Sequence, residues 1–180
     1  MAMRIRSLVT PWIGFAALAT VCLPAIAVAQ VTSKSAAAQQ RKGSGLPLPR
    51  FASLKAGEVN VRAGPATRYP VDWVFQRKGM PVEIVAEFEN WRKIRDWQGT
   101  SGWVRENLLT GKRGFVVAAK PASLHKSPAT SADVVAKLEP QVTGEIRSCA
   151  GDWCRVKVSG VSGWIERTDM WGVYKSEAID

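Results

Sequence analysis

The feature that most constrains how this chain can fold is an internal repeat with a period of 61 to 63 residues. Three segments of the first copy return in the same order in the second. Residues 61–67 (VRAGPAT) align with 124–130 (LHKSPAT), 91–94 (WRKI) with 153–156 (WCRV), and 101–104 (SGWV) with 162–165 (SGWI). Three matches in one order, at slowly drifting offsets, indicate one duplicated unit with small insertions or deletions.

Each copy is rich in short β-prone runs separated by turn residues. The runs at 82–85 (VEIV) and 142–146 (VTGEI) are each followed by a turn, at 89–90 or 151–152, and then by a strand that begins with Trp. A second turn leads into the Gly-Trp strand. With no helical period beyond one turn at 105–108, this pattern predicts an all-β fold of two small closed β-barrels.

Four motifs of the first copy follow one another in an order known from one protein family. They are NVRAGP at 60–65, GMPV at 79–82, WRKI at 91–94 and GWV at 102–104. In this order they resemble the bacterial SH3-like (SH3b) domain, and the resemblance covers nearly all of residues 51–111. The second copy keeps the Trp and Gly-Trp anchors but replaces the Asn-x-Arg-x-Gly-Pro signature, so it is a degenerate copy. The resemblance implies noncatalytic modules that bind the peptide part of peptidoglycan or a protein partner.

The first 29 residues have the features of a secretory signal peptide. A short basic start precedes an uncharged apolar run over 8–28, which ends in the small-x-small site Ala-Val-Ala at 27–29. This pattern predicts cleavage after Ala29 and export to the periplasm or out of the cell. A retained anchor is the alternative, because about 20 apolar residues can span a bilayer. Two prolines and the cleavage site favour removal, so a membrane contact is expected only if the leader is not cleaved.

These features divide the chain into four predicted parts. They are a signal peptide at 1–29, a basic flexible linker at 30–50, a first SH3-like domain at 51–112 and a second, degenerate SH3-like domain at 113–180. The predicted fold class is thus all-β, with two tandem small SH3-like β-barrels after a signal peptide and a flexible linker.

The net charge of +10 is concentrated outside the repeats. The leader carries +2 and residues 30–50 carry +4 with no acid, whereas residues 51–111 and 112–180 carry only +2 each. The nearly balanced repeats lack the strong basic surface that phosphate backbones need, so we expect no nucleic-acid partner. The linker charge is interpreted as a solvated tail, with weak attraction to an anionic surface as the alternative.

Two cysteines remain once the leader, with Cys22, is removed. Cys149 and Cys154 flank a Gly-Asp turn signal, and an even count in an exported chain predicts a disulfide. A redox pair usually has the spacing Cys-x-x-Cys, and a metal site needs further ligands. We therefore predict a structural bridge across a hairpin.

The residues that usually carry catalysis are scarce. His125 is the single histidine, and both mature cysteines are expected to be paired. No nucleophile elbow, phosphate loop or His-Glu-x-x-His motif occurs. The sequence therefore predicts no enzyme, no metal site and no cofactor. A hydrolase with an unrecognised site is the remaining alternative.

The tryptophans of the two repeats divide into core and surface candidates. We expect Trp103 and Trp164, from the two Gly-Trp motifs, to pack in the barrel cores. Trp91 and Trp153, which begin a strand after a tight turn, are also interpreted as core because a Trp ring brings a large apolar area.

One group of side chains in the first repeat is predicted to line a shallow ligand groove. Trp97 lies in a polar hairpin tip and joins Arg62, Tyr69 and Trp73 in this prediction, since aromatic and Arg anchors dominate binding surfaces. The expected ligand is peptidoglycan peptide or an envelope protein, with Arg62 holding a carboxylate. The alternative is a structural or regulatory adaptor that binds only a protein partner in the periplasm. Oligomeric state, barrel packing and any ligand of the second barrel are left open.

Overall fold

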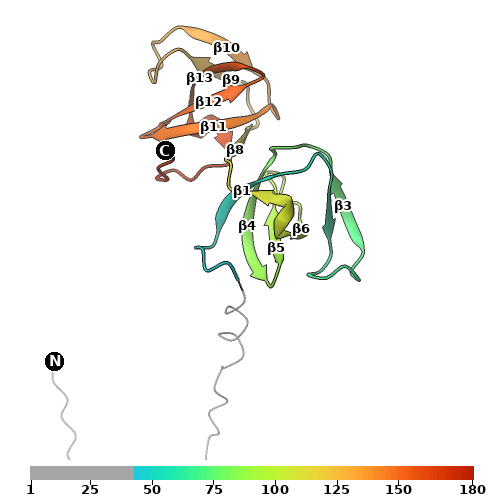
Figure 1. Ribbon diagram of the computed structural model, residues 1–180. Coiled ribbons are helices and arrows are strands. Elements are labelled where there is room, and N and C mark those ends of the chain that lie inside the picture. The colour runs from blue at the N-terminus through green and yellow to red at the C-terminus, as the bar shows by residue number, and fades with distance from the viewer. Residues whose placement is uncertain (1–42) are drawn as a thin grey trace, which may run out of the picture. The chain divides into compact units, whose positions relative to one another are not determined.

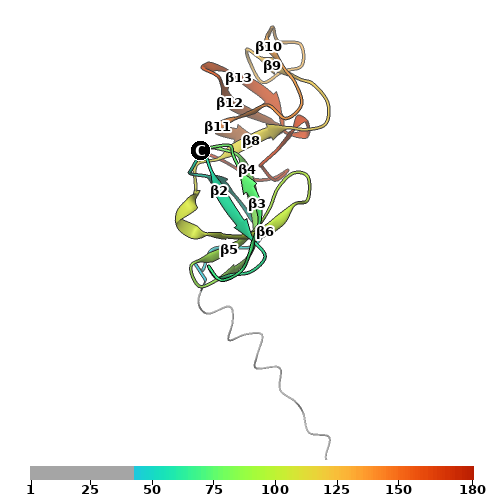
Figure 2. The ribbon, with the colours of Figure 1, turned by 90° about the vertical axis from the view of Figure 1, so that its right-hand side faces the viewer.

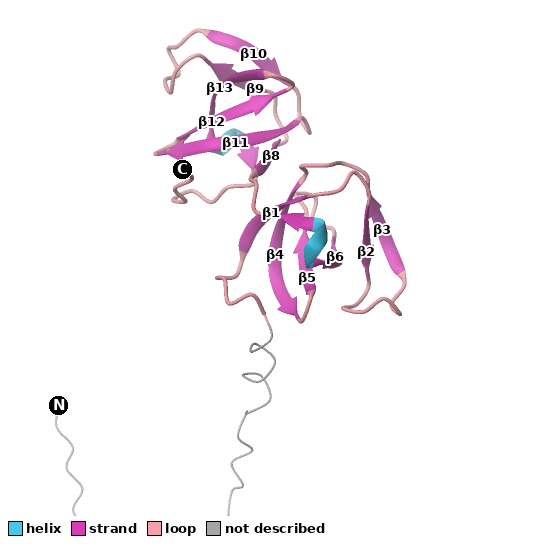
Figure 3. Cartoon of the chain, viewed as in Figure 1, coloured by secondary structure: helices cyan, strands magenta, loops and turns pink. Residues whose placement is uncertain are grey.

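The structure, a computed structural model, describes residues 43–180. The predicted signal peptide at 1–29 and residues 30–42 of the predicted linker lie outside the described residues. Within them the fold is all-β, with two sheets and two short 3-10 helices, as Figures 1 and 3 show. No helix in this part of the chain is long and apolar enough to cross a membrane. The predicted fold class of two tandem SH3-like barrels is confirmed.

The first barrel is a seven-stranded sheet in the order β3-β2-β6-β5-β4-β1-β7. Its strands are β1 (Arg50–Leu54), β2 (Val59–Arg62), β3 (Val71–Phe75), β4 (Pro81–Phe88), β5 (Trp91–Arg95), β6 (Ser101–Arg105) and β7 (Leu109–Thr110). The turn expected at 105–108 is the 3-10 helix η2 (Glu106–Leu108), which joins β6 to β7.

The second barrel repeats this topology strand for strand, in the order β10-β9-β13-β12-β11-β8-β14. Its strands are β8 (Gly114–Val117), β9 (Ala122–His125), β10 (Val134–Leu138), β11 (Thr143–Ala150), β12 (Trp153–Val158), β13 (Val161–Glu166) and β14 (Met170–Trp171). The 3-10 helix η3 (Arg167–Asp169) occupies the place of η2. The chain can be followed by colour through both barrels in Figure 2.

The strand registers of the two barrels also correspond. In the first, Trp103 of β6 lies opposite both Arg62 of β2 and Lys93 of β5. In the second, Trp164 of β13 lies opposite His125 of β9 and Arg155 of β12. The repeat read from the sequence is thus a structural duplication that preserves pairing as well as topology.

The expectation that the Gly-Trp rings fill the cores is wrong. In β6 the buried residues are Gly102 and Val104, which face the core, whereas Trp103 lies between them and is half-buried on the other face. Side chains alternate faces along a strand, so the glycine and the tryptophan of the motif cannot both point inward. Trp164 is half-buried in the same way beside buried Gly163 and Ile165.

The glycine of each Gly-Trp motif allows a neighbouring strand to approach closely. A Cβ atom at Gly102 would lie 2.5 Å from Cγ1 of Val61 and 2.9 Å from the carbonyl oxygen of Arg62. At Gly163 it would lie 2.6 Å from Cγ of Leu124 and 2.8 Å from the carbonyl oxygen of His125. The motif therefore fixes the contact between β2 and β6, and between β9 and β13.

Trp91 and Trp153 occupy equivalent positions with different surroundings. Trp91 is buried, but its ring lies under the guanidinium of Arg105, 5.3 Å from the ring centroid, and it is not part of the core cluster. Trp153 is half-buried and meets the His125 ring edge-on at 5.4 Å. The core interpretation holds for the burial of Trp91 and is wrong for Trp153, since both rings pack on the outer face of the sheet.

The predicted disulfide is present. Cys149 and Cys154 lie opposite each other in the β11–β12 hairpin with their Cα atoms 4.1 Å apart, and a bond joins their sulfurs. Gly151 adopts a positive φ of 56° in the two-residue turn between the strands, where glycine carries no steric penalty. Both cysteines are buried in the core of the second barrel.

The two barrels contact each other through an aromatic cluster. Phe51 of β1 is almost fully buried and meets the Trp171 ring edge-on, with ring centroids 4.8 Å apart. The Tyr174 ring lies 4.6 Å from Phe51, measured between centroids. Edge-to-face and tilted pairs of this kind add to the free energy gained by apolar burial.

Polar and charged side chains surround this cluster. The Tyr174 hydroxyl donates to Oε1 of Glu83 at 2.8 Å, and Nε of Arg95 donates to Oε2 of the same carboxylate at 3.0 Å. Burial raises the pKa of Tyr174 far above its ordinary value, and the hydrogen bond to the Glu83 carboxylate adds to the rise. Burial alone would also raise the pKa of Glu177, but hydrogen bonds from Arg113 outweigh it and hold that pKa below the ordinary value.

The described end of the predicted linker is attached to the first barrel. The Ser44 hydroxyl donates to Oε1 of Glu87 at 2.7 Å, and Nη2 of Arg50 donates to the same oxygen at 2.5 Å. Nε of Arg92 also approaches this oxygen, at 3.2 Å. Burial by itself raises the pKa of Glu87, but the hydrogen bonds from Arg50 and Ser44 lower it below the ordinary value.

Candidate functional site

The edge strand β3 exposes a group of apolar side chains. It is the terminal strand of the first sheet, so one side of its backbone has no neighbouring strand. Trp73 is 55% exposed, and Val71 and Val74 are also exposed. Trp73 lies opposite the buried Val61 of β2, which fixes the position of its backbone in the hairpin. Exposed apolar residues that adjoin one another on an edge strand are typical of interaction sites.

The loop between β2 and β3 is held in place by Arg62. Nη1 of Arg62 donates to the carbonyl oxygens of Tyr69 at 2.7 Å and of Thr67 at 3.2 Å. No carboxylate of the described residues pairs with this guanidinium. The predicted role of holding a ligand carboxylate is therefore left to its other N–H groups, while Nη1 supports the loop.

Tyr69 is positioned by the same loop. The space where Gly64 would carry a Cβ atom is filled by the Tyr69 ring, whose nearest atoms would lie 2.6 Å from that Cβ. The guanidinium of Arg68 lies 5.2 Å from the Tyr69 ring centroid, in a cation–π arrangement. The Gly-Pro signature thus makes room for a ring that an arginine covers.

The structure brings three of the four predicted site residues onto one hairpin and places Trp97 elsewhere. Trp97 lies in the β5–β6 turn, where the Asp96 carboxylate accepts hydrogen bonds from the backbone N–H groups of Gln98 at 2.9 Å and Thr100 at 2.8 Å. The Trp97 ring is half-buried and packs against the core of the first barrel. Within residues 43–180, no ring contact joins it to Trp73.

We define the β2–β3 surface as the accessible side chains that this hairpin carries on and beside its edge strand. Sequence reasoning found Arg62, Tyr69 and Trp73 of this surface. It missed Arg68, Val71 and Val74. Those missed residues could have been found from their place in and just before a β-prone run that follows the Asn-x-Arg-x-Gly-Pro motif. The surface consists of Arg62, Arg68, Tyr69, Val71, Trp73 and Val74.

The second barrel keeps the loop support but not the aromatic side chains. Nδ1 of His125 lies 3.0 Å from the carbonyl oxygen of Ala132, which is the same contact that Arg62 makes with Tyr69 in the first copy. Ala136 lies opposite Leu124 in the second barrel, as Trp73 lies opposite Val61 in the first. Since Leu124 and Val61 directly precede the loop-supporting residues His125 and Arg62, Ala136 occupies the position of Trp73. The aromatic part of the β2–β3 surface therefore has no counterpart in the second barrel.

No catalytic centre stands out among the described residues. Within residues 43–180, no group of three or more His, Cys, Asp and Glu side chains is placed to hold a metal ion. The two carboxyl groups with a lowered pKa, Glu87 and Glu177, owe it to arginine partners that hold chain segments together. Perturbed groups of this kind belong to structural ion pairs as readily as to active sites.

Known proteins similar to this chain were found at the level of the domain. The family model described as bacterial SH3 domain matches twice, at residues 55–111 and 118–172, which together make up more than half of the chain. No curated protein is similar enough to count as a match.

Among solved structures, three similarities share a low sequence identity. NlpC2 from Trichomonas vaginalis is 12% identical with a TM-score of 0.34, and the similarity covers 72% of this chain and 50% of that one. NlpC1 from the same organism is 14% identical with a TM-score of 0.33, covering 77% and 50%. An NlpC/P60 family protein from Bacillus cereus is 15% identical with a TM-score of 0.31, covering 67% and 55%. The chain thus spans about half the length of these proteins.

The two matches to one family model fall on the two barrels, in the order that the internal repeat and the strand pairing require. The chain therefore belongs to the bacterial SH3 domain family, with two tandem copies of the domain.

Proposed function

We propose that the protein is a noncatalytic binding module of the cell envelope, and that its first barrel binds peptidoglycan peptide or an envelope protein through the β2–β3 surface. The observation that carries this proposal is Trp73, the only exposed tryptophan among the described residues. Burial of an exposed Trp ring against a ligand gives a large apolar gain, and such rings are frequent hot spots of binding. Membership in the bacterial SH3 domain family supports a binding role.

The geometry of the surface fits an extended ligand. An extended peptide lying along β3 meets the exposed Trp73 ring, and the unpaired backbone of an edge strand offers hydrogen bonds to it. The N–H groups of Arg62 that the loop does not use are available to a ligand carboxylate. The second barrel, which lacks the aromatic rings, supports the first in this proposal.

Export belongs to the same proposal. The leader at 1–29, with cleavage after Ala29, would deliver the protein to the periplasm or out of the cell, where peptidoglycan is accessible. The basic residues of the linker would add weak, salt-sensitive attraction to an anionic wall.

Co-sedimentation with purified peptidoglycan tests the proposal. The mature protein is compared with Trp73→Ala and with a form that lacks residues 30–42, at low and at physiological salt. The control is Val135→Ala, because Val135 is also exposed on the corresponding edge strand of the second barrel. We expect binding that survives salt and linker loss, is lost in Trp73→Ala and is unchanged in Val135→Ala. Thermal melts should show that Trp73→Ala changes the stability by less than about 0.5 kcal/mol, as is usual for surface substitutions.

The other outcomes identify the alternatives. Binding that disappears with salt or with the linker would be nonspecific charge attraction and would contradict the wall-binding proposal. Absence of binding by the wild-type protein would leave the adaptor, whose partner is a protein alone. Release of soluble muropeptides from the sacculi would contradict the noncatalytic role.

A further inference from the structure

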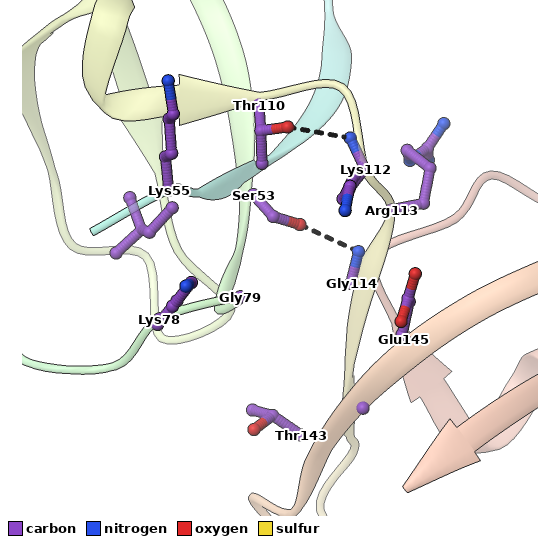
Figure 4. A pocket seen from close by; sticks show the side chains of 12 residues that line it. Ser53, Lys55, Lys78, Gly79, Thr110, Lys112, Arg113, Gly114, Thr143 and Glu145 are labelled. Carbon is purple, nitrogen blue, oxygen red and sulfur yellow. Dashed lines mark hydrogen bonds between the residues drawn. The ribbon is translucent and has the colours of Figure 1, made fainter. Parts of the chain in front are cut away.

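A basic cavity lies where the two barrels meet, away from the β2–β3 surface. Its volume is about 610 Å³, within the range of small-molecule sites. Its lining comes from β1, the β3–β4 turn and β7 of the first barrel, from the segment that connects the barrels, and from β8 and β11 of the second barrel, and Figure 4 shows the lining side chains.

Three lysines on the cavity carry charges that no acidic side chain balances. Lys55, Lys78 and Lys112 line it, and no ion pair involves them among the described residues. The other two charged groups of the lining, Arg113 and Glu145, have partners elsewhere. Arg113 pairs with Glu177, and Glu145 lies 2.9 Å from Nη2 of Arg147. The unbalanced charge at the cavity is therefore positive.

Two hydroxyl groups add hydrogen-bond donors to these cations. Oγ of Ser53 accepts a hydrogen bond from the backbone N–H of Gly114 at 2.8 Å, and Oγ1 of Thr110 accepts one from the backbone N–H of Lys112 at 3.3 Å. Both bonds are drawn in Figure 4. Since each hydroxyl serves as the acceptor, its own hydrogen remains to be donated, and no acceptor for it occurs among the described residues.

The identity of the cations favours one kind of anion. A carboxylate is best held by the planar fork of an arginine, but both Nη groups of Arg113, the one arginine at this cavity, are already used by Glu177 and by the carbonyl oxygen of Gly172, and its Nε is buried. Lysines act as compact point charges that can surround a tetrahedral anion from several sides. Together with hydroxyl donors they match the many acceptor oxygens of a phosphate.

From this arrangement we propose that the cavity binds a phosphate group through Lys55, Lys78 and Lys112. The phosphate can belong to a small molecule or to an anionic polymer, because both present the same group to the three ammonium ions. This site is independent of the β2–β3 surface and of peptidoglycan binding.

The proposal is tested by isothermal titration calorimetry, in which the mature protein is titrated with sodium pyrophosphate at constant ionic strength. The triple variant Lys55→Gln, Lys78→Gln, Lys112→Gln is compared with a control of equal charge change in which three exposed lysines of the second barrel are replaced. The control is Lys126→Gln, Lys137→Gln, Lys157→Gln. We expect the cavity variant to bind about tenfold or more weakly and the control less than about twofold more weakly, from the usual size of exposed charge contacts.

The remaining results decide between the proposal and general charge attraction. Equal losses in the two triple variants, no loss in the cavity variant, or no binding by the wild-type protein would overturn it. Trp73→Ala should bind pyrophosphate as the wild type does, which separates this site from the peptidoglycan proposal. A second titration with long-chain polyphosphate identifies the source. Tighter binding per phosphate than pyrophosphate indicates a polymer, and equal binding indicates a small phosphate compound, each in support of the site.

Discussion

Reduction of the disulfide is expected to lower the free energy of unfolding by about 2 kcal/mol. The Cys149–Cys154 bond joins residues only five positions apart in sequence. For so short a loop the chain-entropy relation gives about 2 kcal/mol at 25 °C, against about 3 for a 15-residue loop. Both cysteines are buried in the core of the second barrel and lie opposite each other in a hairpin, so the native pairing remains in place when the bond is cut. The expected loss therefore comes mainly from the greater freedom of the unfolded chain.

Urea unfolding followed by tryptophan fluorescence measures this loss. Oxidised and reduced protein are compared, with mass spectrometry to confirm the state of the two thiols. For a slope near 2 kcal/mol per molar urea, the midpoint should fall by about 1 M on reduction. The matched control is the double variant Cys149→Ala, Cys154→Ala, whose midpoint should not respond to reductant.

Two results would refute the reasoning at different points. Equal midpoints for protein that is shown to be oxidised and reduced would mean that closing this loop does not limit the unfolded chain. Labelling of both thiols without reductant, in protein collected from the periplasm, would mean that the bridge itself does not form in the cell.

Three further substitutions test the packing and the ionisable contacts. Gly102→Ala should lower the free energy of unfolding by about 1–3 kcal/mol in urea titrations, because the added methyl group collides with Val61; an unchanged midpoint would contradict the close approach. Because the pKa of Tyr174 is raised, its hydroxyl contributes stability that is present below pH 10.0 and is lost as the pH rises further. Tyr174→Phe should therefore make the alkaline decline in melting temperature less steep than in the wild type. Equally steep declines in the two proteins would contradict this. Because the pKa of Glu87 is lowered, its carboxylate contributes stability that is present above pH 4.5 and is lost as the pH falls below that value. Glu87→Gln should therefore lose less stability than the wild type in thermal melts between about pH 5 and about pH 3. An equal loss in the two proteins would contradict this.

The fold was predictable because turn residues occur at the same positions in both copies of the repeat. Turn residues at matching places in both copies limit each strand to a few residues, and a chain of short strands has few closed arrangements. The disulfide followed from the same reasoning, since the Gly-Asp signal placed Cys149 and Cys154 on facing strands before any coordinates were known. Local chemistry thus carried most of the architecture.

The orientation of the Gly-Trp strands was not predicted, although a signal for it was present. The prediction placed Trp103 in the core without applying the alternation by which the faces of a strand are assigned. Val104 is fully buried, which places its neighbour Trp103 on the opposite face. Position 102 needs a glycine because β2 approaches it closely, and the residues of β2 that do so, Val61 and Arg62, lie about 40 positions away along the chain.

Only the candidate site residues that are near one another in the sequence lie together in the structure. Arg62, Tyr69 and Trp73 lie close together in the sequence, so their place on one hairpin was predictable, whereas the hydrogen bond from Nη1 of Arg62 to the Tyr69 carbonyl oxygen was not predicted. Trp97 lies on another hairpin, and its place depends on how the β5–β6 turn folds onto the core. A sequence shows that a turn is polar, as at Trp97, but not whether the ring within it bends toward the core or toward solvent.

The comparison of the two barrels separates what the fold needs from what a ligand needs. Both copies support the β2–β3 or β9–β10 loop from the same position, with Arg62 in one and His125 in the other, and both keep a glycine where two strands approach. These are requirements of the barrel, and each copy meets them. Trp73 has no such structural task, because an exposed ring adds little to stability, and its place in the second copy is taken by Ala136. Trp73 is thus a large apolar side chain that only one of two equivalent barrels carries and that the barrel does not need, and this difference supports the proposal that the first barrel binds its ligand there.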